Sequence, residues 1–199
     1  MRGSNRRSEI NMNSIPPALL LHVCCAPCAS ACVERLLAEG RQITFYYSNS
    51  NVVSEEEFEK RLACVKQLAN YHKLELIVDP YDHQSWRNHV SKLPRFESAP
   101  EGGARCVKCF EWSLGRTAEL AKSRNMNFTT TLTVSPHKNS KLIFSIGGKW
   151  THFEPYDFKK CDGFKRSLDL SAQFGFYRQA FCGCEYSLRG REEIKKVVC

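Results

Sequence analysis

The chain has 199 residues, a length that suits one domain, or one domain with a small attachment, and that can bury a core of useful size. No stretch of the sequence approaches the ~20 consecutive apolar residues that a membrane-spanning helix needs. The net charge is +8. A basic surface attracts polyanions such as nucleic acids by releasing their counterions, although many basic proteins only gain solubility from such a charge.

The first residues, 1–17, are polar and basic and predict a disordered tail. This segment has no apolar core, so it does not predict a secretory signal. The sequence also holds 11 cysteines. In a chain without a secretory signal we expect a cytoplasmic, reducing location, where metal or redox chemistry is more common than a disulfide framework.

Strand and helix patterns alternate along the chain. A continuous apolar run predicts the first strand, and a capping box at Ser54 and Glu57 predicts the start of a helix. The expected strands are Leu19–Val23, Ile43–Tyr47, Leu74–Val78 and Phe128–Val134, and the expected helices are Ala29–Glu39, Ser54 to about His72, Cys106 to about Ser123 and one from near Asn139. This order predicts a parallel sheet flanked by helices. We expect residues 18–199 to form one α/β domain with a cysteine-rich C-terminal part.

Three cysteines, Cys24, Cys25 and Cys28, follow the first expected strand and begin its helix. We call them the cysteine trio. Ligands of open parallel sheets bind outside the carboxyl ends of the strands, and a helix N-terminus favours thiolate over thiol. A single cysteine here would fit a small buried apolar residue. Three together favour metal ligands or nucleophiles.

Two further pairs, Cys106-x-x-Cys109 and Cys182-Gly183-Cys184, have spacings that let both sulfurs face one metal centre. We call these four residues the cysteine tetrad. Four thiolates are enough for one tetrahedral zinc or one [4Fe–4S] cluster, and the spacing does not choose between them. A structural zinc takes four protein ligands, whereas a catalytic metal keeps an open position. The tetrad and the trio together therefore predict two neighbouring centres, one closed and one open.

The remaining cysteines lie in helical or terminal contexts and are interpreted as structural or incidental: Cys32, Cys64, Cys161 and Cys199. His22 lies within the first strand, where a packed histidine is the favoured interpretation. His137 lies in a polar stretch after the last expected strand. It suits either a phosphate or base contact or an ordinary helix N-cap.

At these motifs the chain resembles epoxyqueuosine reductases of the QueH type. The motifs occur in the same order and span Leu19 to about Leu188: His22–Cys28, Pro100–Cys106, Cys109-Phe110, Thr129–Lys138, Asp157–Lys160 and Tyr177–Gln179 leading to Cys182–Cys184. One departure is visible. The family tends to carry Tyr-Asn-Pro-Asn after the second strand, whereas this chain reads Ser48-Asn49-Ser50-Asn51, so both asparagines persist without the proline.

The resemblance implies a fold like that of the adenine nucleotide alpha hydrolase and PP-loop enzymes. It also implies a [4Fe–4S] cluster next to a separate iron, and the reduction of epoxyqueuosine to queuosine in tRNA, the last step of queuosine biosynthesis. We expect the tetrad to hold the cluster and the trio to hold the second iron with open coordination. The cluster would pass on electrons from an external donor, and the iron would act as a Lewis acid.

A proton is also needed, and Asp157, Tyr177 or a bound water can supply it. Trp86, Phe110 and Tyr177 are candidates for stacking on the base, with core packing favoured for Phe110. The expected substrate and tRNA contacts are Asn49, Asn51, Arg105, His137, Lys138, Lys159 and Arg178, with Lys108 and Lys160 as further phosphate candidates. For each basic residue, a solvated basic face is the alternative.

Two other functions fit part of the pattern. An iron–sulfur PP-loop enzyme that thiolates tRNA would need a glycine-rich phosphate loop after the first strand. That place is occupied by Cys24–Cys28, which is poorly suited to binding phosphates. A non-catalytic, zinc-stabilised RNA-binding module would explain the tetrad and the charge, but it would leave the trio without a role.

Overall fold

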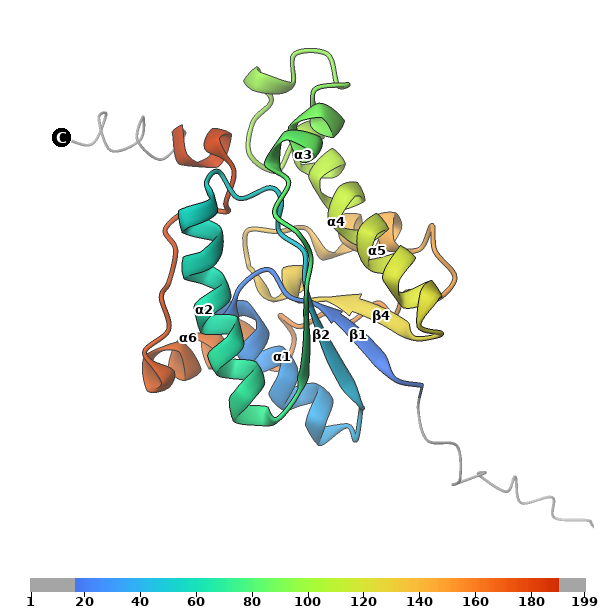
Figure 1. Cartoon of the computed structure of the whole chain (residues 1–199), viewed down its shortest axis with the longest axis vertical. Helices are drawn as coiled ribbons and strands as arrows, with labels where there is room; N and C mark the ends of the chain where they lie inside the picture. The colour runs from blue at the N-terminus through green and yellow to red at the C-terminus, as the bar shows by residue number, and fades with distance from the viewer. Residues whose placement is uncertain (1–16, 190–199) are drawn as a thin grey trace, which may run out of the picture.

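A computed structural model describes residues 17–189 of the chain (Figure 1). Apart from Pro17, the predicted tail lies outside the described residues, as does Cys199. The strands are β1 (Leu19–His22), β2 (Ile43–Tyr47), β3 (Glu75–Val78) and β4 (Asn127–Thr130). The α-helices are α1 (Ala26–Ala38), α2 (Glu55–His72), α3 (His83–Val90), α4 (Ala104–Ser123), α5 (Ser140–Gly147) and α6 (Gly163–Phe174), with 3₁₀ helices η1 (Phe96–Ser98) and η2 (Thr131–Val134).

The four strands form one parallel sheet in the order β3-β2-β1-β4. The chain builds β1, β2 and β3 outward in one direction and then crosses back to place β4 on the other side of β1. The strand order therefore reverses between β1 and β4. In open α/β sheets the crevice at such a reversal, beyond the carboxyl ends of the strands, is where ligands bind.

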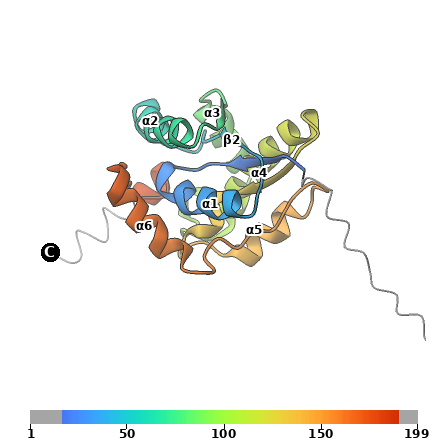
Figure 2. The ribbon, with the colours of Figure 1, turned by 90° about the horizontal axis from the view of Figure 1, so that it is seen from below.

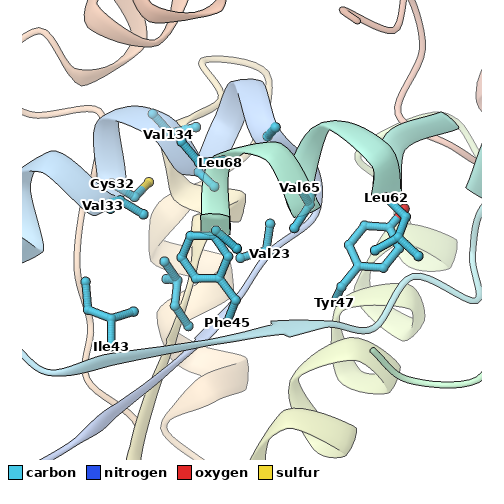
Figure 3. Packing of buried hydrophobic residues seen from close by; sticks show 14 of the residues in the cluster. Val23, Cys32, Val33, Ile43, Phe45, Tyr47, Leu62, Val65, Leu68 and Val134 are labelled. Carbon is cyan, nitrogen blue, oxygen red and sulfur yellow. The ribbon is translucent and has the colours of Figure 1, made fainter. Parts of the chain in front are cut away.

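Alternating residues of the strands fill two core layers. Leu19, Leu21 and Phe45 pack against α1 and α2, and Figure 3 shows Phe45 close to Val23 and Val65 in this layer. Leu20 and its neighbours on the opposite face pack against α4 and α5. In Figure 1, accordingly, α1 and α2 lie on one side of the strands and α4 and α5 on the other. Both faces of the sheet are covered, which explains why β1 is a continuous apolar run.

Helix α6 lies beside α1, as Figure 2 shows from below. The sequence pattern weakened after Gly147, and α6 was not predicted. The short helix α3 was also missed, although Asp82 caps it by accepting a hydrogen bond from the backbone N–H of Ser85. Both helices are amphipathic but contain few apolar residues, so their polar composition hid the helical pattern.

The expected strand Phe128–Val134 is too long. Strand β4 ends at Thr130, whose side-chain oxygen accepts a hydrogen bond from the N–H of Leu132 and starts the 3₁₀ turn η2. Helix α1 begins at Ala26, three residues earlier than expected, because Pro27 fits the first turn of a helix. Within the described residues, no helix is long and apolar enough to cross a membrane.

Candidate functional site

The cysteine trio lies at the reversal of strand order, between the carboxyl ends of β1 and β4. Cys24 and Cys25 follow β1 directly, and Cys28 lies in the first turn of α1. The Thr131 hydroxyl, just after β4, accepts a hydrogen bond from the Cys24 N–H at 3.2 Å and donates to the Cys24 sulfur at 3.3 Å. These two hydrogen bonds therefore connect the ends of β1 and β4 at Cys24.

The three sulfurs of the trio lie within 4.8 Å of one another. Among the described residues this is the one group of three or more cysteine, histidine or acidic ligand atoms that is so close. The thiols are free, as are all the cysteines of the described part. Such a spacing suits a single metal ion held by three thiolates.

The three thiols of the trio differ in how readily they lose a proton. Hydrogen bonds from Cys24 and Cys28 lower the pKa of the Cys25 thiol well below its ordinary value, although burial opposes this. The hydrogen bond to Cys25, together with burial, raises the pKa of Cys24 to about 12. Hydrogen bonds to Cys24 and Cys25, together with burial, raise the pKa of Cys28 well above its usual range. Three ionised sulfurs so close together need a cation between or beside them.

The cysteine tetrad lines a second, smaller cavity of about 110 Å³. Cys106 and Cys109 belong to the first turns of α4, and Cys182 and Cys184 belong to the C-terminal segment. Cys109 and Cys182 also line a larger neighbouring cavity of about 480 Å³, together with Cys24 and Cys28. The fold therefore brings the three cysteine segments to adjoining cavities.

The loop that carries Cys182 and Cys184 is fixed to α2 and to the loop before it. Arg61, only 3% exposed, donates to the Cys182 carbonyl at 2.9 Å and pairs with Glu57. The Val53 N–H donates to the Gly183 carbonyl at 2.9 Å. Gly183 has a positive φ of 154°, and a Cβ there would meet the Asn51 side chain at 2.9 Å. A residue with a side chain would be strained at this φ, so glycine is favoured here.

Several predicted substrate contacts do line the larger cavity: Asn49, Asn51, His137, Lys138 and Arg178. Asn49 is buried and donates from its side chain to the Val23 carbonyl, so it also fixes the strand end. Lys138 is half-buried, and although burial opposes its charge, its electrostatic interaction with the nearby cysteines Cys182 and Cys24 raises its pKa. Its ammonium adds positive charge to a cavity that is otherwise rich in sulfur.

His22 also lines this cavity, and its packing confirms the sequence interpretation. The ring is buried, with one nitrogen 2.9 Å from the Thr130 hydroxyl and the other 3.2 Å from the Ser48 carbonyl. Burial lowers the pKa of His22 to about 4. The ring is thus neutral at physiological pH and bridges β1, β2 and β4 at their carboxyl ends.

Other predicted residues have different surroundings, although Arg105 lines the smaller cavity beside the tetrad. The guanidinium of Arg105 is buried and donates to the Phe96 and Ala99 carbonyls at 2.6 Å each, so it orders the loop before α4 rather than facing solvent. Lys159 donates to the Lys138 carbonyl at 2.6 Å. Two more of the phosphate candidates lie away from both cavities, since Lys108 pairs with Glu111 and Lys160 borders a groove with Arg35.

The two predicted proton donors line neither cysteine-lined cavity. Asp157 accepts a hydrogen bond from the Ser140 hydroxyl at 3.1 Å and borders a separate groove. Tyr177 donates its hydroxyl to Glu57 at 3.1 Å, and the Lys60 ammonium lies 4.1 Å from the centre of its ring. Both residues are engaged with other parts of the protein.

Of the predicted stacking residues, Trp86 is completely buried beside Cys109 and Cys184. Phe110 lies in the core layer between the sheet and α4, which confirms its packing role. Sequence reasoning missed Phe181, Arg61 and Gln179, which all line the larger cavity. Phe181 and Gln179 lie just before the Cys182–Cys184 motif in the sequence, and this closeness to the cysteines was the signal that could have identified them.

Comparison with known proteins identifies the family. The family model described as "Epoxyqueuosine reductase QueH" matches residues 19–190. The chain is 34% identical to the epoxyqueuosine reductase QueH of Streptococcus pyogenes serotype M1 over 88% of this chain and 72% of that protein. For the proteins of the same name from Thermotoga maritima and Acinetobacter baylyi the identities are 33% and 31%, covering 88% and 94% of this chain and 92% and 87% of theirs. The chain therefore belongs to the epoxyqueuosine reductase QueH family of oxidoreductases.

Proposed function

We propose that this protein reduces the epoxide of epoxyqueuosine in tRNA to give queuosine, the last step of tRNA queuosine biosynthesis. Family membership supports the reductase role. The observation that carries the proposal is the pair of adjoining cavities, in which Cys24 and Cys28 of the trio share one cavity with Cys109 and Cys182 of the tetrad. Two centres so placed can cooperate on one substrate.

The tetrad fits a [4Fe–4S] cluster better than a single zinc ion. Around one tetrahedral zinc, with Zn–S bonds of about 2.3 Å, the sulfurs would be about 3.8 Å apart. No three sulfurs of the tetrad, all of them described residues, lie within 4.8 Å of one another. Their wider spacing around a cavity of about 110 Å³ suits a larger inorganic group. We assign the cluster to Cys106, Cys109, Cys182 and Cys184.

The trio suits a separate iron. Its three sulfurs are close enough for one ion, and three protein ligands leave a position open for chemistry. Soft thiolate ligands favour iron over magnesium or calcium. When bound, the cluster and the iron would supply electron transfer and a Lewis acid beside the larger cavity. We assign the catalytic role to Cys24, Cys25 and Cys28 on this basis.

Loss of the epoxide oxygen consumes two electrons and two protons, because it yields an alkene and one water. The electrons must come from an external donor, passed on one at a time. The proton source stays a prediction: Asp157 and Tyr177 line neither cavity, so either would have to act through water. Lys138 and His137, at the cavity, are nearer candidates for holding a proton or a water there.

The tRNA would be bound through its anticodon loop, whose unstacked bases can be splayed into a protein pocket. Arg178 and His137 are exposed and border the larger cavity, and with Lys138 they would contact phosphate or base. Lys159 and Arg105 would contribute indirectly, since their side chains bind backbone carbonyls around the site. Asn49 and Asn51 would face the modified base.

Three wider statements belong to the same proposal. We infer that residues 18–199 act as one α/β metalloenzyme domain, since the described residues share one sheet. We also infer that the fold is related to the adenine nucleotide alpha hydrolase and PP-loop enzymes, and that the protein works in the cytoplasm, where tRNA is modified and thiols stay reduced.

The test is a turnover assay under anaerobic conditions. Protein reconstituted with iron and sulfide is incubated with a strong one-electron reductant and tRNA that contains epoxyqueuosine, and the digested nucleosides are analysed by mass spectrometry. We expect the loss of one oxygen atom from the modified nucleoside. Stoichiometric zinc without acid-labile sulfide in anaerobically purified protein would instead support a zinc-stabilised RNA-binding module and overturn the proposal.

A further inference from the structure

Gln179 connects the segment after α6 to the cysteine trio. Its side-chain amide N–H donates to the Cys25 sulfur at 3.1 Å, across 154 residues of sequence. It also lines the larger cavity. The amide orientation follows from this contact, because the Cys25 sulfur accepts hydrogen bonds here, including one from Cys24 at 3.9 Å. A donor, the amide nitrogen, must therefore face the sulfur.

The other end of the same amide is left without a partner. The Gln179 side-chain oxygen is buried and has no hydrogen-bond partner among the described residues. A buried carbonyl without a partner costs about 1–3 kcal/mol. In a cavity of about 480 Å³ the missing donor can come from a bound molecule. The oxygen is thus an acceptor held ready for a ligand N–H or O–H group.

The backbone on both sides holds Gln179 in this position. Before it, the Tyr177 hydroxyl donates to Glu57 and the Arg178 guanidinium donates to the Ser171 hydroxyl at 3.3 Å. After it, the Cys182 carbonyl accepts from Arg61 at 2.9 Å. Residues 177–182 are therefore anchored to α2 and α6, and the amide has no need to reorganise when a ligand arrives.

We propose that Gln179 is both a positioning residue for the Cys25 thiolate and a hydrogen-bond acceptor for a donor group of the substrate. The first role rests on geometry alone, whereas the second rests on the function proposed above. An N–H donor to a metal-bound thiolate withdraws electron density from the sulfur and so tunes the metal, and such partners also orient the ligand. The epoxyqueuosine nucleoside offers both N–H and O–H donors to the facing oxygen.

The positioning role is tested without substrate. Metal-free protein is titrated with Co²⁺ under anaerobic conditions, and the spectrum of a Cys25→Ala variant is subtracted to isolate the trio. In Gln179→Leu and Gln179→Glu, both of which lose the N–H donor, we expect the thiolate-to-cobalt charge-transfer band to move to lower energy and the affinity to fall about tenfold. Gln173→Leu, the same change at an exposed position of α6, is the control. A wild-type band and affinity in both Gln179 variants would overturn this role.

The acceptor role is tested by steady-state kinetics with the modified tRNA. Gln179→Glu keeps an acceptor oxygen, whereas Gln179→Leu does not. We expect Gln179→Leu to raise KM about tenfold more than Gln179→Glu, since one hydrogen bond to the substrate is lost. Equal KM values for the two variants would overturn the acceptor role. If the wild-type protein shows no turnover, the proposed function and the acceptor role fail together, while the cobalt spectra still decide the positioning role.

Discussion

Among the three cysteines of the trio, Cys25 is the one that ionises most readily. It is 1% exposed, it accepts from Gln179, and hydrogen bonds from its two neighbours lower its pKa. Cys24 and Cys28 give up their protons less readily. A bound cation would allow all three to ionise, so metal binding and deprotonation are coupled at this site.

The change Cys25→Ala should remove the second metal and leave the cluster in place. We expect iron content to fall from about five to about four atoms per chain, with acid-labile sulfide unchanged, because the tetrad is built from other segments. Turnover of epoxyqueuosine should be lost. The control Cys161→Ser alters an exposed cysteine and should keep both the cluster and the separate iron. Full turnover by Cys25→Ala would contradict the assignment of the open site.

Asp79 offers a pH-dependent test of how one residue stabilises the fold. Burial disfavours the ionised carboxylate, but hydrogen bonds from Arg116 at 2.5 and 2.6 Å and from Ser48 at 2.7 Å outweigh this and lower its pKa. A carboxylate with a lowered pKa stabilises the fold above its unfolded pKa of about 3.9, and this contribution is lost as pH falls through the folded pKa.

We expect Asp79→Asn to reduce the free energy of unfolding by about 1–2 kcal/mol at pH 7, a range that allows for the partial exposure of Arg116. The difference from wild type should begin to shrink as the pH falls below about 4, and it should disappear only below the lowered folded pKa of Asp79, where both proteins are neutral at this position. Urea unfolding of the metal-free proteins across this pH range measures it. Glu75→Gln, which breaks the exposed pair with Arg124, is the control and should have a smaller effect.

At the scale of elements, the start of α6 depends on one glycine. A Cβ on Gly163, the first residue of α6, would overlap the backbone carbonyl of Phe158. Phe158 itself is buried in the core layer that contains Val134. Helix α6 therefore starts where only a hydrogen can fit, and this close approach sets its position beside α1.

Gly163→Ala should lower the free energy of unfolding by about 2–3 kcal/mol, since the overlap can be relieved only by moving backbone. Gly115→Ala is a matched control within α4, where a Cβ would make an ordinary contact with Trp150 at 3.5 Å. There we expect a gain of about 0.5–1 kcal/mol, because alanine restricts the unfolded chain and favours the helix. Chemical denaturation of both variants compares them. Equal stabilities would contradict the steric explanation.

For the whole molecule, the net charge of +8 is consistent with a polyanionic partner. The basic residues are not equivalent, however. Arg178 borders the larger cavity and is exposed, whereas Arg105 and Lys159 are bound to backbone carbonyls. Lys122, near the end of α4, lies towards the opposite edge of the sheet. Proximity to the cavity, rather than total charge, should decide which of them contact tRNA.

We expect Arg178→Ala to weaken tRNA binding and to reduce the slope of log affinity against log salt by about 0.7–0.9, the value of one lost phosphate contact. Lys122→Ala should leave both the affinity and the slope unchanged. Binding measured by fluorescence anisotropy at several salt concentrations gives the two slopes. An equal effect of the two variants would point to binding spread over the whole basic surface.

Much of this protein is determined by local sequence. Strand β2 was predicted with its observed bounds, β1 and β3 within one residue, and α2 with its capping serine, because apolar runs and caps act over a few neighbouring residues. The trio was placed at a strand end for the same reason, since Cys24, Cys25 and Cys28 share one turn of chain.

The tertiary structure alone decided which distant segments meet. That Cys109 and Cys182 border one cavity, that Arg61 fixes the Cys182 carbonyl, and that Gln179 reaches Cys25 all depend on how α6 and the residues after it pack. In the same packing Arg105 donates to a backbone carbonyl, while Asp157 and Tyr177 bind Ser140 and Glu57 and line neither cysteine-lined cavity. Local sequence cannot encode such contacts, because they arise only when separate elements bury their apolar faces against a common sheet.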